Sequence, residues 1–152
     1  MRTLALFICV ILLAACSSAD TPPAADTSAV VSEAPPAALS LATMAGMWDT
    51  NVRRQGNDSI VATNVLNATD STAWTFAFPN RAPIAMRVTG TSGDTVMWET
   101  GSFESAVKKG LMTSNTGKSW MRDGKMIGVV TARYETTGPD TVIVFDTEAT
   151  KR

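Results

Sequence analysis

The sequence contains no histidine, and only two of its 152 residues are cysteines. Histidine is the commonest general base and a common metal ligand, so its absence removes the usual centre of acid–base and metal-assisted catalysis. With 13 lysines and arginines against 14 aspartates and glutamates, the chain also lacks the strong positive charge typical of nucleic-acid binding. No clustered run of Lys or Arg indicates electrostatic attachment to a membrane. We therefore expect no catalysis, no metal or cofactor and no nucleic-acid partner.

Long hydrophobic runs are also missing. The apolar segment from Leu4 to Ala15 is about half of the ~20 residues that a transmembrane helix needs. A short apolar run behind one basic residue, Arg2, is instead typical of a secretory signal peptide. Cys9 lies inside this run and would be removed with it, which leaves Cys16 as the one cysteine of the mature chain. Such a chain has no disulfide to form in an oxidising compartment.

The residues Leu13-Ala14-Ala15-Cys16 follow the apolar run, and Ser17 comes directly after them. This order resembles the signal of bacterial lipoproteins. In that family the chain is cleaved before the cysteine, whose sulfur carries a diacylglyceryl group and whose new amine is usually acylated. The resemblance implies that residues 1–15 are a signal peptide and that Cys16 holds the protein at a membrane of the cell envelope. Because Ser rather than Asp follows the cysteine, it also implies the outer membrane, if the organism has one. The alternative is an ordinary secretory leader with a chance cysteine near the cut.

Residues 16–41 contain no aromatic side chain and consist mainly of Ala, Ser, Thr and Pro. Such a segment buries too little apolar surface to offset the entropy lost on ordering. We expect a disordered tether that spans about 25 to 30 Å. All ten glycines and all four tryptophans lie beyond Leu41. The remaining residues, 42–152, are enough for one compact domain and too few for two.

Within 42–152, short runs of alternating apolar and polar residues are separated by turn residues. Trp48, Thr50 and Val52, for example, share one face of a strand. The pattern predicts eight strands, at residues 48–53, 59–66, 74–78, 84–89, 95–100, 111–121, 126–134 and 141–147. Asp123-Gly124 is a strong signal for a two-residue hairpin turn. The segment 102–110 breaks the alternation and predicts a short helical turn, capped by Ser102 and ended by Gly110.

The order and spacing of these strands restrict the topology. Short connections make neighbouring strands antiparallel, because parallel strands need long crossovers. Eight antiparallel strands in sequence order form an up-and-down meander, and closing it into a barrel removes exposed edges. We therefore predict an all-β fold, an eight-stranded antiparallel barrel, with a two-sheet sandwich as the rival arrangement.

The first predicted strand begins with Gly46-Met47-Trp48. This segment resembles the Gly-x-Trp signature of calycin-type barrels, which include lipocalins, avidins and small periplasmic metalloprotease inhibitors. In those families the tryptophan closes one end of the barrel, and a basic side chain near the end of the last strand packs over it. The resemblance implies this role for Trp48, with Lys151, Arg152 or Arg133 as its partner. The domain departs from these families in its short length and its lack of a disulfide. An ordinary core tryptophan at a strand start explains Trp48 as well.

A closed eight-stranded barrel is either filled by its own side chains or able to hold one small ligand. The candidate lining residues are bulky and apolar, and they suit an apolar or amphipathic guest. They are Trp74, Phe76, Phe78, Met86, Val88, Val96 and Trp98. The same residues would fill a dry core equally well, which is the ordinary arrangement in so short a chain. An internal cavity of about 300 Å³ or more distinguishes the two arrangements.

Two patterns that are typical of enzymes have simpler explanations here. Ser105-Ala106-Val107-Lys108 matches the Ser-x-x-Lys motif of penicillin-recognising enzymes, but the companion Lys-Thr-Gly and Ser-Asp-Asn motifs are missing. A capped surface turn explains the same residues. Asp94, Glu99 and Glu104 are close in sequence, but the alternation of a strand gives them no common focus for paired-carboxylate chemistry.

The sequence thus favours a membrane-anchored, non-enzymatic lipoprotein whose barrel binds a small apolar or amphipathic molecule, with the 102–110 loop at the rim. The alternative is a protein-interaction or protease-inhibitor-like module with a filled core, which engages another envelope protein through its surface or its tether.

Overall fold

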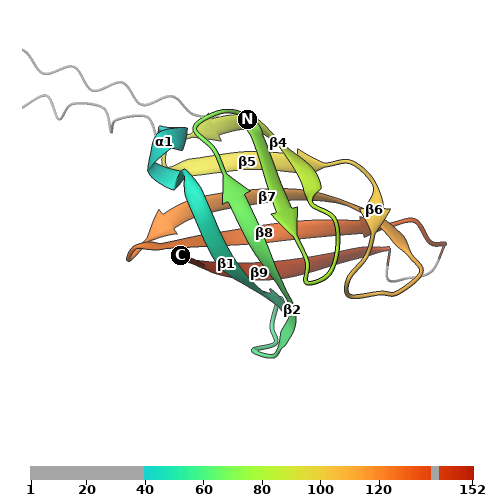
Figure 1. Cartoon of the computed structure of the whole chain (residues 1–152). Coiled ribbons are helices and arrows are strands. Elements are labelled where there is room, and N and C mark those ends of the chain that lie inside the picture. Colours follow the sequence, from blue (N-terminus) through green and yellow to red (C-terminus); the bar gives the residue numbers. More distant parts are fainter. Residues whose placement is uncertain (1–39, 138–140) are drawn as a thin grey trace, which may run out of the picture. The chain divides into compact units, whose positions relative to one another are not determined.

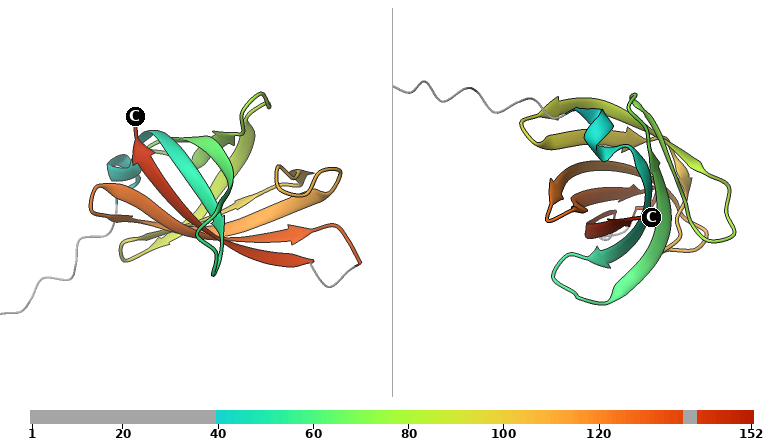
Figure 2. Two further views of the ribbon diagram at one scale, coloured as in Figure 1. Left: turned by 90° about the horizontal axis from the view of Figure 1, so that it is seen from below. Right: turned by 60° about the vertical axis from the view of Figure 1, so that its left-hand side comes forward.

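The structure is a computed structural model that describes residues 40–137 and 141–152. The expected signal peptide, Cys16 and nearly all of the expected tether lie outside the described residues. The described residues form a closed eight-stranded antiparallel β-barrel with one short extra strand (Figures 1 and 2). The predicted all-β barrel is therefore confirmed, and the rival sandwich is wrong.

Each predicted strand is present, within a few residues of its expected bounds. The elements are α1 (Leu41–Met44), β1 (Gly46–Arg54), β2 (Ile60–Ala68), β3 (Ala73–Ala77), β4 (Ile84–Ser92), β5 (Thr95–Thr100), β6 (Phe103–Glu104), β7 (Met112–Arg122), β8 (Lys125–Tyr134) and β9 (Val142–Lys151). The barrel closes because β5 pairs with β7 and β9 pairs with β1, while the short β6 pairs with the first residues of β7.

The two ends of the barrel differ in their connections. One end, here called the closed end, carries α1, the tight β4–β5 and β7–β8 turns and the end of β9. Asp123 and Gly124 in the β7–β8 turn have φ angles of 52° and 74°, as the predicted hairpin requires. The other end, here called the open end, carries the loops after β1, β3, β6 and β8.

The prediction of a helical turn at 102–110 is wrong. The segment contains β6 and then a bent loop, because pairing with β7 holds its first residues extended. The capping hydroxyl belongs to Ser105 rather than Ser102. Ser105 Oγ accepts hydrogen bonds from the backbone N–H groups of Val107 and Lys108, at 3.1 and 2.9 Å. A serine hydroxyl in this segment therefore caps backbone N–H groups of a turn, and not those of a helix.

The hydrophobic core is densest toward the closed end. The largest fully buried side chains are those of Trp48, Trp74, Met44 and Val96. The indole Nε1 of Trp48 donates a hydrogen bond to the backbone oxygen of Met44 at 2.9 Å, which fixes α1 against the barrel. Burial of these four side chains contributes hydrophobic stabilisation at this end.

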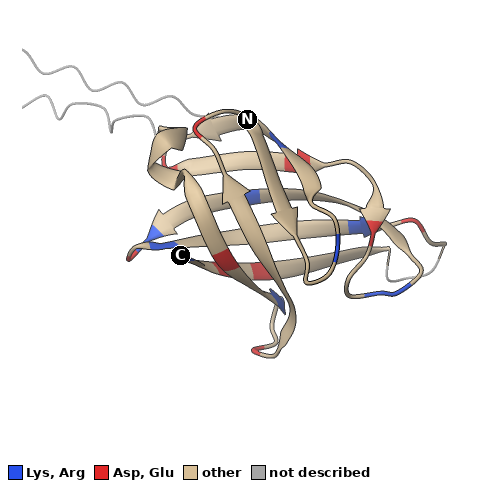
Figure 3. Cartoon of the chain, viewed as in Figure 1, with Lys and Arg blue, Asp and Glu red and all other residues tan. Residues whose placement is uncertain are grey.

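Charged residues lie on the strands and in the loops, and both signs are interspersed in the view of Figure 3. None of the helices in the described part of the chain is long and apolar enough to cross a membrane.

Candidate ligand-binding site

Trp48 closes one end of the barrel beneath a lysine. Lys151 Nζ lies 5.4 Å from the centroid of the Trp48 ring. Gly46, with φ of 139°, leaves room for this lysine, since a Cβ there would lie 2.7 Å from Lys151 Cε. Of the other basic residues considered, Arg152 donates to Asp49 Oδ1 at 2.7 Å, and Arg133 lies on β8 toward the open end. Lys151 is therefore the basic partner of Trp48.

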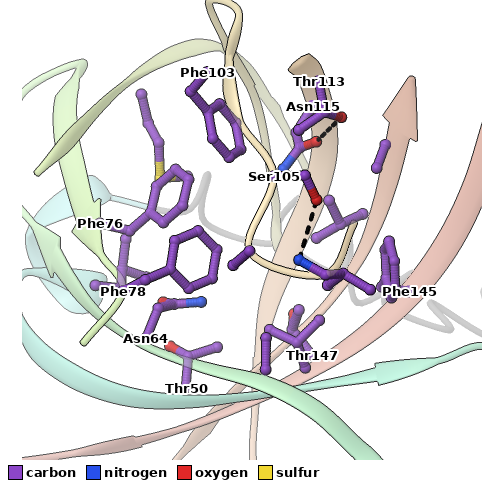
Figure 4. Close-up of a pocket in the computed structure, with 18 of the residues that line it drawn as sticks. Thr50, Asn64, Phe76, Phe78, Phe103, Ser105, Thr113, Asn115, Phe145 and Thr147 are labelled. Atoms are coloured by element: carbon purple, nitrogen blue, oxygen red, sulfur yellow. Dashed lines mark hydrogen bonds between the residues drawn. The ribbon is translucent and has the colours of Figure 1, made fainter. Parts of the chain in front are cut away.

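A cavity of about 90 Å³ lies inside the barrel, on the open-end side of Trp48 (Figure 4). All eight barrel strands contribute to its walls, and residues 105–107 of the loop after β6 complete them. Aromatic rings supply much of its apolar surface: Phe76, Phe78, Trp98, Phe103, Tyr134 and Phe145. Its polar lining comes from Thr50, Asn64, Ser105, Thr113, Asn115, Ser119 and Thr147.

Three phenylalanines form one wall of the cavity. The ring centroids of Phe76 and Phe78 are 5.5 Å apart, and those of Phe76 and Phe103 are 5.6 Å apart. Both pairs pack edge to face, which is a favourable geometry for aromatic rings. β3 and the β6 segment are far apart in sequence, so this cluster also fixes the rim loop to the barrel wall.

The size of the cavity limits what it can hold. At about 90 Å³ it is smaller than the 300 Å³ that we expected for an enclosed ligand. It has room for about three water molecules, since each occupies about 30 Å³ in the liquid. The cavity therefore suits a small ring or the end of a short apolar chain, and not a drug-sized molecule.

The predicted lining residues divide into two groups. Phe76, Phe78, Met86 and Trp98 line the cavity. Trp74, Val88 and Val96 do not line it, and they are instead buried in the core. Trp74 Nε1 donates to backbone oxygens of the β2–β3 loop at 3.0 Å, so this ring packs near the closed end. Alternation along a strand identifies the inward face, but it does not tell how deep along the barrel each side chain lies.

Most of the polar lining was not predicted. The sequence predicts that Thr50 shares a face with Trp48 and Val52, but it does not predict Asn64 and Asn115 as interior residues, and both line the cavity. The signal that could have found Asn64 is its position between Ala62 and Leu66, since every second residue of a strand faces the same side. All three of these β2 residues line the cavity.

Four polar side chains in the described part of the chain are buried, namely Thr50, Ser105, Thr113 and Ser119. Ser105 caps the rim turn, and Thr113 Oγ1 donates to the backbone oxygen of Arg133 at 3.0 Å. Ser119 Oγ accepts from Trp98 Nε1, also at 3.0 Å. The hydroxyl of Thr50 differs, because it has no hydrogen-bond partner within the described residues.

Charged groups lie outside the cavity, and none of its lining residues is Asp, Glu, Lys or Arg. Hydrogen bonds from Arg152 and Lys125 lower the pKa values of Asp49 and Glu148, respectively, at the barrel surface. Glu99 pairs with Arg87, and Glu104 lies 3.9 Å from Arg81.

The three carboxylates considered above have separate partners. Asp94 accepts a hydrogen bond from Thr95 Oγ1 at 3.0 Å. Glu99 and Glu104 instead interact with Arg87 and Arg81, respectively. No cluster of three or more potential metal ligands occurs among residues 40–137 and 141–152.

The Ser-x-x-Lys pattern forms part of the rim. Ser105 Oγ is occupied as an acceptor of two backbone hydrogen bonds. Lys108 Nζ lies 4.9 Å from the centroid of the Tyr134 ring, where a cation–π contact holds the loop to β8. These contacts give the motif a structural role at the mouth of the cavity.

The chain matches no protein-family model, and comparisons with curated proteins and with solved structures give no significant match.

Proposed function

We propose that this chain is a lipid-anchored, non-enzymatic protein of the cell envelope whose barrel binds a small apolar or amphipathic molecule. The observation that carries the proposal is the cavity of about 90 Å³ beside the Phe76, Phe78 and Phe103 cluster, in a barrel whose other end is covered by Lys151 and α1. A module with a filled core is the alternative, and the small volume of the cavity also fits it, since it is below the 300 Å³ that we expected for an enclosed ligand.

The cavity alone gives only weak binding. A guest of about seven non-hydrogen atoms buries roughly 200 Å² of apolar surface, worth about 5 kcal/mol, which corresponds to a Kd of roughly 0.2 mM. Stronger binding needs further contacts outside the cavity. An amphipathic molecule gains these if its apolar end enters the barrel and its remainder rests on the rim.

The open end offers apolar surface for such contacts. Five of the six exposed large hydrophobic residues of the described chain lie there: Ile60, Val61, Val107, Met112 and Val142. Four of these residues stand at the first positions of β2, β7 and β9, which begin at this end. Val61, Met112 and Val142 each neighbour an inward-facing residue of the same strand, so their side chains face outward, and the apolar surface lies around the outside of the mouth.

Binding can be tested by filling the cavity. Ala62 lines it, whereas Ala85 on β4 is exposed. We expect toluene to shift the ¹³C-methyl NMR signals of Met86 and Met126 in the full-length lipidated protein held in lipid nanodiscs. Ala62→Phe should abolish these shifts, and the matched variant Ala85→Phe should retain them. Equal shifts in both variants, or none in the unsubstituted protein, would refute cavity binding.

The anchor is tested separately. Mass spectrometry of the mature N-terminal peptide should find a diacylglyceryl group on Cys16. The Cys16→Ser chain should leave the membrane fraction, whereas Cys9→Ser, which changes the expected signal peptide, should remain in it. A mature protein that begins upstream of Cys16 would contradict the anchor without affecting the cavity.

A further inference from the structure

We infer that the guest of the cavity is uncharged and carries a polar group that hydrogen-bonds to the Thr50 hydroxyl, as a small alcohol, phenol or amide does. This inference rests on the proposed function and specifies its ligand class. It excludes an ionised carboxylate inside the barrel, and it predicts that a hydrocarbon binds more weakly than a neutral polar molecule of the same size.

The first observation is the state of Thr50. The residue is 7% exposed, and Oγ1 has no hydrogen-bond partner within the described residues. Buried hydroxyls are nearly always paired, because burial without a partner loses their hydrogen bonds to water. The three other buried polar side chains of the described barrel follow this rule. Thr50 is thus the exception, and it lines the cavity.

The second observation is the neighbourhood of Thr50. It lies directly opposite Asn64 in the β1–β2 register, and Thr147 lies opposite the next inward residue of β1, Val52. Figure 4 shows Thr50, Asn64 and Thr147 along one wall of the cavity, with Phe76 and Phe78 near Asn64. A hydroxyl donates and accepts, and an amide offers both functions as well. The wall therefore suits a guest group that is itself a donor or an acceptor.

The third observation is the absence of charge among the lining residues. An ionised guest group buried there would lose its hydration without gaining a counter-charge, which is strongly unfavourable. A neutral polar group loses far less and regains a hydrogen bond at Thr50. Charge and hydrogen bonding together restrict the guest to neutral amphipathic molecules.

Phenol and toluene provide a matched pair of probes, because they have the same number of non-hydrogen atoms and differ in one hydroxyl. Thr50→Val removes the hydroxyl with little change in shape, and Thr50→Ser keeps it. Thr63→Val removes a hydroxyl from the exposed neighbour of Asn64 on β2 and serves as the control. Dissociation constants are measured from the Met86 and Met126 methyl signals of the full-length protein in nanodiscs.

Loss of one neutral hydrogen bond predicts that Thr50→Val weakens phenol about three- to tenfold relative to toluene. Thr50→Ser and Thr63→Val should leave the ratio of the two constants within about twofold of the unsubstituted protein. An unchanged ratio in Thr50→Val would overturn the inference, and it would mean that a water molecule or nothing pairs with Thr50. Because toluene would still bind in that case, the proposed function would stand. If neither probe shifts the methionine signals, both the inference and the proposed function fail.

Discussion

The indole ring of Trp98 occupies the space that a side chain on Gly117 would need. The two residues are directly opposite each other where β5 pairs with β7 and closes the barrel. A Cβ on Gly117 would lie 2.2 Å from Cζ2 of Trp98, which is far inside van der Waals contact. Trp98 also lines the cavity. Closure of the barrel and the shape of its interior therefore depend on the same pair.

Gly117→Ala should destabilise the protein by about 1–3 kcal/mol, because the added methyl must displace the Trp98 ring in a packed interior. The measurement is chemical denaturation followed by circular dichroism. Gly101→Ala is the control, since a Cβ there has no heavy atom within 4 Å. Equal effects of the two substitutions would contradict the packing argument.

Lys151→Met should cost about 0.5–1 kcal/mol, because it keeps most of the aliphatic stem over Trp48 and removes the cation–π contact. Lys118 on β7 is exposed, so Lys118→Met should have a smaller effect. Thermal unfolding of both variants at the same pH measures the difference. A Lys151 variant as stable as the Lys118 variant would show that the charge does not contribute to covering the tryptophan.

Thr50→Val should raise the free energy of unfolding of the ligand-free protein by about 1 kcal/mol, because it removes a buried hydroxyl that has no partner. Thr113→Val is the informative contrast. Its hydroxyl donates to the backbone oxygen of Arg133 at 3.0 Å, so its loss removes a buried hydrogen bond and should destabilise the fold. Denaturation curves that show the same sign for both substitutions would contradict this assignment of hydrogen bonds.

Acid should weaken the surface pairs of Asp49 with Arg152 and of Glu148 with Lys125. The hydrogen bonds lower the pKa values of both carboxyls in the folded protein. Their contribution to stability is therefore present above the ordinary carboxyl pKa of about 4, and it is lost as the pH falls through the lowered values. Asp49→Asn combined with Glu148→Gln should flatten the fall in melting temperature between about pH 5 and pH 2. Asp70→Asn, at an exposed position in the β2–β3 loop, should leave that slope unchanged.

The sequence predicted the strands well because the barrel interior is distinct from its surface. In β8 and β9, inward and outward residues alternate in burial for most of each strand, as the period of two requires. The hairpin at Asp123-Gly124 was equally predictable, because an Asp-Gly pair favours the positive φ angles that a two-residue turn requires, and both residues adopt them. Closure is consistent with strand order, because β5 and β7 are consecutive once the short β6 is set aside and the last strand, β9, pairs with the first, β1.

The rim and the interior were less predictable, and the reason is that both depend on contacts between distant segments. Cap and turn residues in 102–110 favoured a helix locally, but pairing of β6 with β7 overrides them. β7 contains a polar run, residues 114–119, yet it spans 11 residues because it pairs with both β5 and β8. Asn64 and Asn115 line the cavity, although sequence reasoning normally assigns polar residues to the surface. The unpaired hydroxyl of Thr50 can be identified only when all of its neighbours are in place.

The most direct test of ligand binding is native mass spectrometry of the lipidated protein isolated from the cells that produce it. We expect a small uncharged molecule to accompany the unsubstituted protein and the Ala85→Phe variant, and to be absent from Ala62→Phe. An unsubstituted protein that carries no small molecule, but copurifies with another envelope protein, would contradict the ligand-binding account and support an interaction module instead.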